Sequence, residues 1–143
     1  MSEPVRVALV VEGPTDSVVI EAAIARVLGG RPFVPVLLQP EGSLAFGQHG
    51  GGWGGVYRWC RQTAERNGGR LAGDVVFDSY DILVIHLDAD VAAERYSDAN
   101  VQVIFHDLPC ERPCPPPEST TNALRRVLLN WAGEIVEPAC TVL

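Results

Sequence analysis

One stretch near the start of the chain decides the fold: Val7-Ala8-Leu9-Val10-Val11, followed by Glu12-Gly13-Pro14-Thr15-Asp16. A continuous apolar run rich in valine is typical of a strand that is buried on both faces of a parallel sheet. The glycine and proline after Glu12 break this strand, and Thr15 is a good N-cap for a helix. Apolar residues at helical spacing from Val18 to Val27 predict that helix.

A second apolar run also ends in acids: Ile82-Leu83-Val84-Ile85-His86-Leu87, followed by Asp88-Ala89-Asp90. In open α/β sheets, ligands bind beyond the carboxyl ends of the strands, so the acids of both runs are expected to meet there. Asp88 and Asp90 alternate in an extended backbone and are expected to face one side. Asp16, four residues after Glu12, is expected on the same rim.

Carboxylates at close range repel each other unless a cation neutralises them, so this arrangement predicts a divalent metal ion. Hard oxygen ligands without a nearby cysteine or histidine suit Mg²⁺ or Mn²⁺ better than zinc. Two such ions can clamp the attacking and leaving oxygens of a phosphodiester. The predicted ligands are Glu12, Asp16, Asp88 and Asp90.

The rest of the chain alternates expected strands and helices, which predicts an α/β fold with a mainly parallel central sheet. Pro35 within the second strand indicates an edge position or a bulge. A glycine-rich segment, expected to be a long loop, separates that strand from the next helix. The expected elements are strands at 33–38, 81–87, 101–105 and 139–143, and helices at 56–67 and around 124–131.

Length and composition narrow the possible functions. The 143 residues are expected to form one domain, 1–143, with a net charge of −7. All eleven basic residues are arginine, so a phosphate loop of the Walker type and Schiff-base chemistry lack their lysine. The start of the chain has no signal-peptide pattern, and no apolar run is long enough to cross a bilayer. We therefore expect a cytoplasmic protein with reduced cysteines and no membrane contact.

The acidic motifs resemble those of the Toprim family, a Glu after the first strand and an Asp-x-Asp after a later strand. Here these are Glu12 and the pair Asp88/Asp90. Asp16 makes the likeness greatest to the Toprim part of the overcoming-lysogeny-defect nucleases. The resemblance covers residues 5–28 and 81–91 and implies a Toprim-like fold with Mg²⁺-dependent hydrolysis of nucleic acid. It further implies that Glu12 is an acid/base or metal ligand and that the aspartates are ligands.

Two features depart from that family pattern. Ala92 stands where a longer Asp-x-Asp-x-Asp motif would have its third acid, and the downstream lysine of the overcoming-lysogeny-defect nucleases is absent. The chain also ends inside the expected strand 139–143, as if shortened at its C-terminus. These features favour a second hypothesis, a non-catalytic module that acts through a protein partner or a missing C-terminal part. A small-molecule phosphatase-like enzyme is the third hypothesis.

Weaker motifs were weighed against structural explanations. Arg58 and Arg61, near the glycine-rich segment, are candidates for contacting phosphates. Gly50-x-Gly52-x-x-Gly55 has the letters of a dinucleotide fingerprint but does not directly follow its strand. Cys110 and Cys114, with His106, have no common zinc-site spacing, and two packed thiols are the favoured interpretation.

Overall fold

The computed structural model describes residues 2–41, 49–102, 108 and 117–133. Its sheet is parallel throughout, with β1 (Val5–Val10) between β2 (Phe33–Gln39) and β3 (Ile82–Ile85). The side chains of Val7, Ala8, Leu9 and Val10 are fully buried, because helices cover both faces of this central strand. The expected α/β fold is confirmed as a Rossmann-like arrangement of a parallel sheet flanked by helices.

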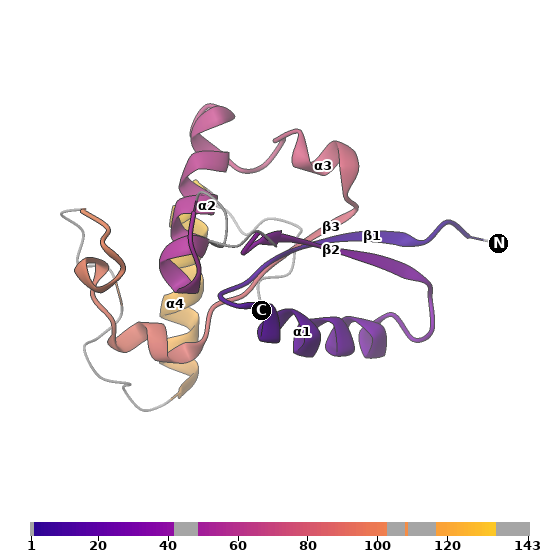
Figure 1. The fold of residues 1–143 in the computed structure, drawn as a ribbon, viewed down its shortest axis with the longest axis horizontal. Helices are drawn as coiled ribbons and strands as arrows, with labels where there is room; N and C mark the ends of the chain where they lie inside the picture. The colour runs from indigo at the N-terminus through magenta and orange to yellow at the C-terminus, as the bar shows by residue number, and fades with distance from the viewer. Residues whose placement is uncertain (1, 42–48, 103–107, 109–116, 134–143) are drawn as a thin grey trace.

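Two helical layers cover the sheet (Figure 1). On one face, Ile20 and Ile24 of α1 (Pro14–Val27) pack in a cluster with Val7 and Leu9. The other face carries Ala8 and Val10, which lie in a cluster with α2 (Gly52–Arg66) and α4 (Pro117–Trp131). Successive residues of β1 therefore face opposite layers, as the alternation of a strand requires.

Short helical elements complete the described chain: α3 (Val76–Ser79), η1 (Ala89–Ala93) and η2 (Tyr96–Ala99). The carboxyl ends of the strands point toward the side of the molecule where α2 and α4 lie next to each other (Figure 1). Both acidic motifs follow strands at this edge of the sheet, so the fold brings the two strand exits to one side of the molecule.

The position of β2 agrees with its sequence. It is an edge strand of the described sheet, and Pro35 pairs with Val7 of β1. Because no described strand lies on the other side of β2, the N–H that proline lacks is not needed there. The register shifts where Leu9 pairs with Leu37 and Val10 pairs with Gln39. Of the two alternatives raised by the proline, the edge position is confirmed for the described sheet, while the irregularity lies between Leu37 and Gln39 and not at Pro35.

The start and the buried face of α1 differ from expectation. Gly13 rather than Thr15 is the N-cap, because the carboxylate of Asp16 accepts a hydrogen bond from the Gly13 N–H at 2.9 Å. The helix does not bury its valines, since Val18 is 67% exposed and Val27 is 84% exposed. The residues that face the sheet are Ser17, Ile20 and Ile24.

The prediction that the glycine-rich segment is a loop is partly wrong. Helix α2 begins within that segment, at Gly52 and not at residue 56. A Cβ on Gly54 would lie 2.6 Å from Cβ of Ala99, and one on Gly55 would overlap the carbonyl of Gly50. Such close approach is available only to glycine, so tertiary packing outweighs its low helix propensity.

The apolar stripe of α4 is confirmed. Its four expected residues are buried in the cluster on the α2 side, and Gly133 follows with a positive φ of 71° as the expected stop. The expected strand 139–143 and residues 103–105 of the expected strand 101–105 lie outside the described residues. Residues 101–102 are not in a strand. The stripe is Leu124, Val127, Leu128 and Trp131.

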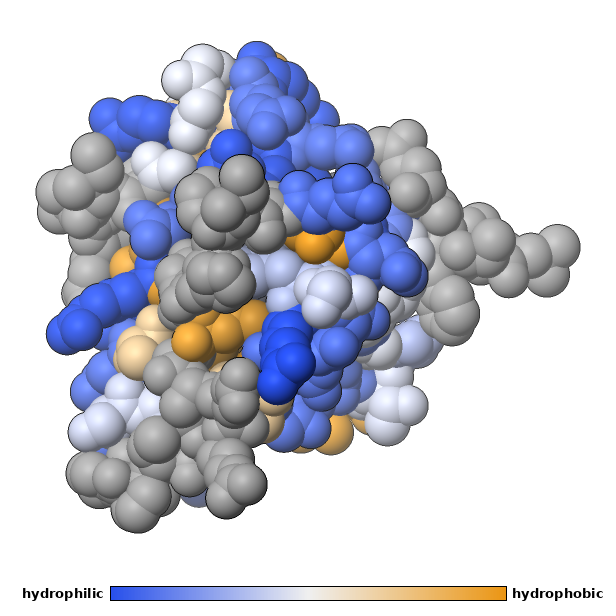
Figure 2. Space-filling view, turned by 90° about the vertical axis from the view of Figure 1, so that its left-hand side faces the viewer, coloured by the Kyte–Doolittle hydropathy of each residue, from blue (hydrophilic) through white to orange (hydrophobic). Residues whose placement is uncertain are grey.

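On the face shown in Figure 2, apolar surface is limited to separate areas between hydrophilic side chains. Among the helices that the structure describes, none is long and apolar enough to cross a membrane.

Candidate functional site

The exits of β1 and β3 are joined by two hydrogen bonds. The backbone N–H of His86 donates to the carbonyl of Val10 at 2.9 Å, which extends the parallel pairing beyond the last strand residues. Two residues further on, the N–H of Asp88 donates to Oε1 of Glu12 at 2.7 Å. A side chain thus replaces the next carbonyl of the ladder. The structure thereby brings the two acidic motifs into direct contact.

Glu12 occupies a half-buried position beyond β1. Its carbonyl accepts a hydrogen bond of 2.8 Å from the N–H of Gly52, the first residue of α2. The pKa of the Glu12 carboxyl is raised to about 7, chiefly by burial and further by the negative charges of Asp88, Asp90 and Asp16, while the hydrogen bond from the Asp88 N–H lowers it. The four predicted ligands are therefore close enough to interact electrostatically.

Asp16 has a structural role within this group. It is the third residue of α1, and its Oδ2 accepts the hydrogen bond from the N–H of Gly13. An acid in the first turn also interacts favourably with the helix dipole. The structure thus uses one carboxylate oxygen of Asp16 to fix the turn between Glu12 and α1.

Asp90 is not extended, so the expectation that it alternates with Asp88 along a strand is wrong. Asp88 has an extended backbone and is the N-cap of η1, and its carbonyl accepts the N–H of Val91 at 3.2 Å. Asp90 lies in the first turn of that helix and is exposed. The chain turns there because Val91 and Ala92 are buried, which pulls the backbone toward the core.

The carboxylates at the two strand exits could hold a divalent cation, but they are not already arranged around one metal position. Within residues 2–41, 49–102, 108 and 117–133, no three or more acidic, histidine or cysteine side chains are already gathered around one metal position. Mg²⁺ commonly takes only one or two carboxylates and keeps several waters. Burial is the largest cause of the raised pKa of Glu12, and the nearby negative charges, which a bound cation would offset, add to it. The donor set therefore fits Mg²⁺ or Mn²⁺.

The two candidate phosphate-binding arginines have protein partners. Arg58 donates from Nε to the carbonyl of His49 at 2.7 Å and from Nη1 to the carbonyl of Ala99 at 3.0 Å. Arg61 lies 3.5 Å from Glu65 one turn along α2. Arg58 thus ties the segment before α2 to η2.

Of the described histidines and cysteine, His86 lies beside the Asp88 carboxylate, while His49 and Cys60 are buried. His49 lies in a turn before α2 and is buried. Nε2 of His86 is 3.9 Å from Oδ1 of Asp88, as a neighbour of the carboxylate group. Cys60 is fully buried, which raises the pKa of its thiol to about 12 and leaves it unreactive. The possible zinc residues His106, Cys110, Cys114 and Cys140 lie outside the described residues.

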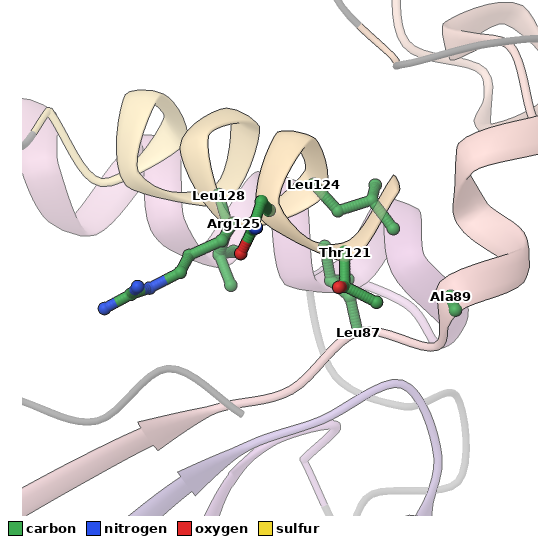
Figure 3. Close-up of a pocket in the computed structure, with 7 residues that line it drawn as sticks. Leu87, Ala89, Thr121, Leu124, Arg125 and Leu128 are labelled. Atoms are coloured by element: carbon green, nitrogen blue, oxygen red, sulfur yellow. The ribbon is translucent and has the colours of Figure 1, made fainter. Parts of the chain in front are cut away.

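A cavity of about 280 Å³ lies between the exit of β3 and α4 (Figure 3). Leu87 and Ala89, on either side of Asp88 in the chain, line it from the exit of β3. From α4 it is lined by Thr121, Asn122, Leu124, Arg125 and Leu128. Sequence reasoning found the leucines as core residues but missed this cavity. The available signal was the polar residues that alternate with the apolar stripe of α4.

Comparison of the chain with protein-family models, with curated proteins and with solved structures finds no match.

Proposed function

We propose that this chain is a Toprim-like domain that hydrolyses phosphodiester bonds of nucleic acid with Mg²⁺ or Mn²⁺. The observation that carries the proposal is the hydrogen bond from the Asp88 N–H to Glu12, which joins two acidic motifs separated by 76 residues. A contact at the carboxyl ends of parallel strands is where an α/β sheet binds its ligands.

Glu12, Asp88 and Asp90 would hold the cation, and Asp16 would assist from the start of α1. A bound divalent cation supplies Lewis-acid stabilisation of phosphate charge. The pKa of about 7 belongs to Glu12 without a cation, and a cation held by this carboxylate would lower that pKa. Asp88 and Asp90 are the exposed members of the group, so they lie where a phosphate can approach from solvent.

The direct test is a cleavage assay. Wild-type protein is incubated with labelled DNA and RNA, in Mg²⁺, in Mn²⁺ and in chelator, beside the variant Glu12→Gln/Asp88→Asn. We expect metal-dependent cleavage that the variant lowers by at least about 100-fold, since removal of a principal electrostatic group typically costs that much.

A matched control removes the same charge elsewhere. Glu3 and Asp78 are exposed acids away from the strand exits, so Glu3→Gln/Asp78→Asn should cleave like wild type. Equal cleavage by the Glu12/Asp88 variant, or undiminished cleavage in chelator, would exclude the assigned site.

A non-catalytic module is the second candidate, and one observation favours it. Two of the acids have structural roles here, since Asp16 accepts the Gly13 N–H at the start of α1 and Glu12 accepts the Asp88 N–H. Acids kept only for these roles would bind no cation. Calorimetric titration with Mg²⁺ and Mn²⁺ separates the candidates, because the module predicts no saturable binding.

A further inference from the structure

His86 lies at the same strand exit as the candidate metal ligands. Its backbone N–H donates to the carbonyl of Val10 at 2.9 Å, so the parallel pairing fixes its position one residue beyond β3. Asp88 follows two residues later with an extended backbone, and residues two apart in such a backbone face the same side. The imidazole and the carboxylate are therefore neighbours, with Nε2 of His86 at 3.9 Å from Oδ1 of Asp88.

The distance between these two atoms does not fit a hydrogen bond. Hydrogen bonds between nitrogen and oxygen are about 2.7–3.2 Å long, and the separation here is 3.9 Å. A metal ion binds nitrogen and oxygen ligands at about 2.0–2.2 Å, so two ligands of one ion can be up to about 4.3 Å apart. One ion between Nε2 and Oδ1 therefore fits the observed separation.

The burial of the imidazole ring supports the same arrangement. Nδ1 of His86 is buried and has no hydrogen-bond partner among the described residues, while the side chain as a whole is 21% exposed. A buried polar atom without a partner destabilises a fold, so a histidine at this position calls for a reason other than stability. Binding of an ion through Nε2 is such a reason, because this is the nitrogen next to the carboxylate.

We infer that His86 is a nitrogen ligand of the cation at the strand exits and makes the site select Mn²⁺ over Mg²⁺. The inference rests on the proposed function, which supplies the cation held by Glu12 and Asp88. The sequence predicted ligand oxygens only, and these do not distinguish the two ions. Imidazole binds transition metals well, whereas Mg²⁺ prefers oxygen ligands and keeps several waters. A nitrogen ligand beside Asp88 therefore favours Mn²⁺.

The first test uses bound Mn²⁺ to report its own ligands. Pulsed electron paramagnetic resonance detects the magnetic coupling between Mn²⁺ and a nitrogen nucleus that is bound to it. We expect ¹⁴N coupling in the wild-type protein, replaced by ¹⁵N coupling when the histidines carry ¹⁵N. His86→Phe should abolish the coupling, since phenylalanine keeps a flat ring without nitrogen. Thermal unfolding checks that this variant is folded, and the wild-type spectrum stands as evidence independently of it.

The second test measures selectivity by calorimetric titration with each ion separately. Wild type should have the lower Kd for Mn²⁺. His86→Phe should raise the Kd for Mn²⁺ at least about tenfold and change the Kd for Mg²⁺ less than about threefold, as expected when one group at a metal site is lost. Glu3→Gln/Asp78→Asn, which changes exposed acids away from the strand exits, is the control and should keep the wild-type coupling and both Kd values.

The outcomes distinguish this inference from the proposed function. Saturable Mn²⁺ binding without nitrogen coupling, equal Mn²⁺ affinities of wild type and His86→Phe, or a wild-type preference for Mg²⁺ would overturn the inference and leave the metal site in place. Nitrogen coupling that His86→Phe abolishes, in a protein that cleaves neither DNA nor RNA, would support the inference and overturn the proposed hydrolysis. Absence of saturable binding of either ion would overturn both.

Discussion

The backbone N–H of Asp88 donates a hydrogen bond of 2.7 Å to Oε1 of Glu12, and this bond ties the exit of β3 to the exit of β1. It continues the inter-strand pairing in which the His86 N–H meets the Val10 carbonyl. A carboxylate at this place is held by the backbone of a neighbouring strand and not by a cationic side chain. Among the described residues, no lysine or arginine is paired with Glu12. Its charge is therefore available to a cation.

Glu12→Gln should stabilise the protein at high pH. The pKa of Glu12 is raised in the folded state to about 7, so protonation favours folding below the ordinary pKa of 4.5, and this contribution is lost as pH rises through 7. At pH 8 we expect the variant to be more stable by about 1–2 kcal/mol, after allowing for solvent screening at a half-exposed carboxyl. Urea unfolding of both proteins at pH 4 and pH 8 measures this, and an unchanged difference between the two pH values would contradict it.

Mg²⁺ should raise the melting temperature of the wild-type protein. A ligand that binds only the folded state at a hundred times its Kd adds about 2.7 kcal/mol, a shift on the order of 10 °C for a domain of this size. We expect calorimetry to show this shift in wild type and in the Glu3→Gln/Asp78→Asn control, and chelator to reverse it. The Glu12→Gln/Asp88→Asn variant should not respond, and a full response there would place the cation elsewhere.

Arg66→Ala should destabilise the fold by about 2–3 kcal/mol, because it leaves a buried carboxylate without its cation. Nε and Nη2 of Arg66 donate to both oxygens of Asp74 at 2.8 and 2.6 Å, and the Asp74 side chain is 2% exposed. Arg66 lowers the pKa of Asp74, so this stability is present above the ordinary pKa and lost as pH falls through the lowered one.

Chemical denaturation at neutral and at acidic pH checks this pair. Arg61→Ala is the matched control, since Arg61 and Glu65 form an exposed pair on the same helix worth less than about 0.5 kcal/mol. A loss no larger than that of the control would show that Asp74 does not depend on Arg66.

Gly55→Ala should destabilise the fold by more than about 2 kcal/mol, because the added methyl overlaps the carbonyl of Gly50 and the amide of Gln39. These groups precede Gly52, whose N–H holds the carbonyl of Glu12, so the substitution should also weaken Mg²⁺ binding. Thermal unfolding and calorimetric titration measure the two effects. Gly29→Ala meets no atom within 4 Å and should cost only the strain of its positive φ, about 1 kcal/mol.

The features that the sequence determined alone are local. The valine-rich run before Glu12 is a strand because it is continuous and bounded by Gly13 and Pro14, and it lies at the centre of the sheet because no polar residue interrupts its buried core. Pro35 assigned β2 to an edge through its missing N–H. The stripe of α4 followed from helical periodicity, which is a property of neighbouring residues.

Features that depend on contacts between residues far apart in the chain could be seen only in the tertiary structure. The start of α2 depends on how closely Gly54 approaches Ala99, and the turn at Asp90 depends on burial of Val91. The sequence identified Glu12 and Asp88 as acids at two strand exits, but only the parallel register of β1 and β3 made the Asp88 N–H the partner of Glu12. The cavity lined by Leu87, Ala89 and α4 likewise exists only because α4 packs near the exit of β3, an arrangement that no local pattern encodes.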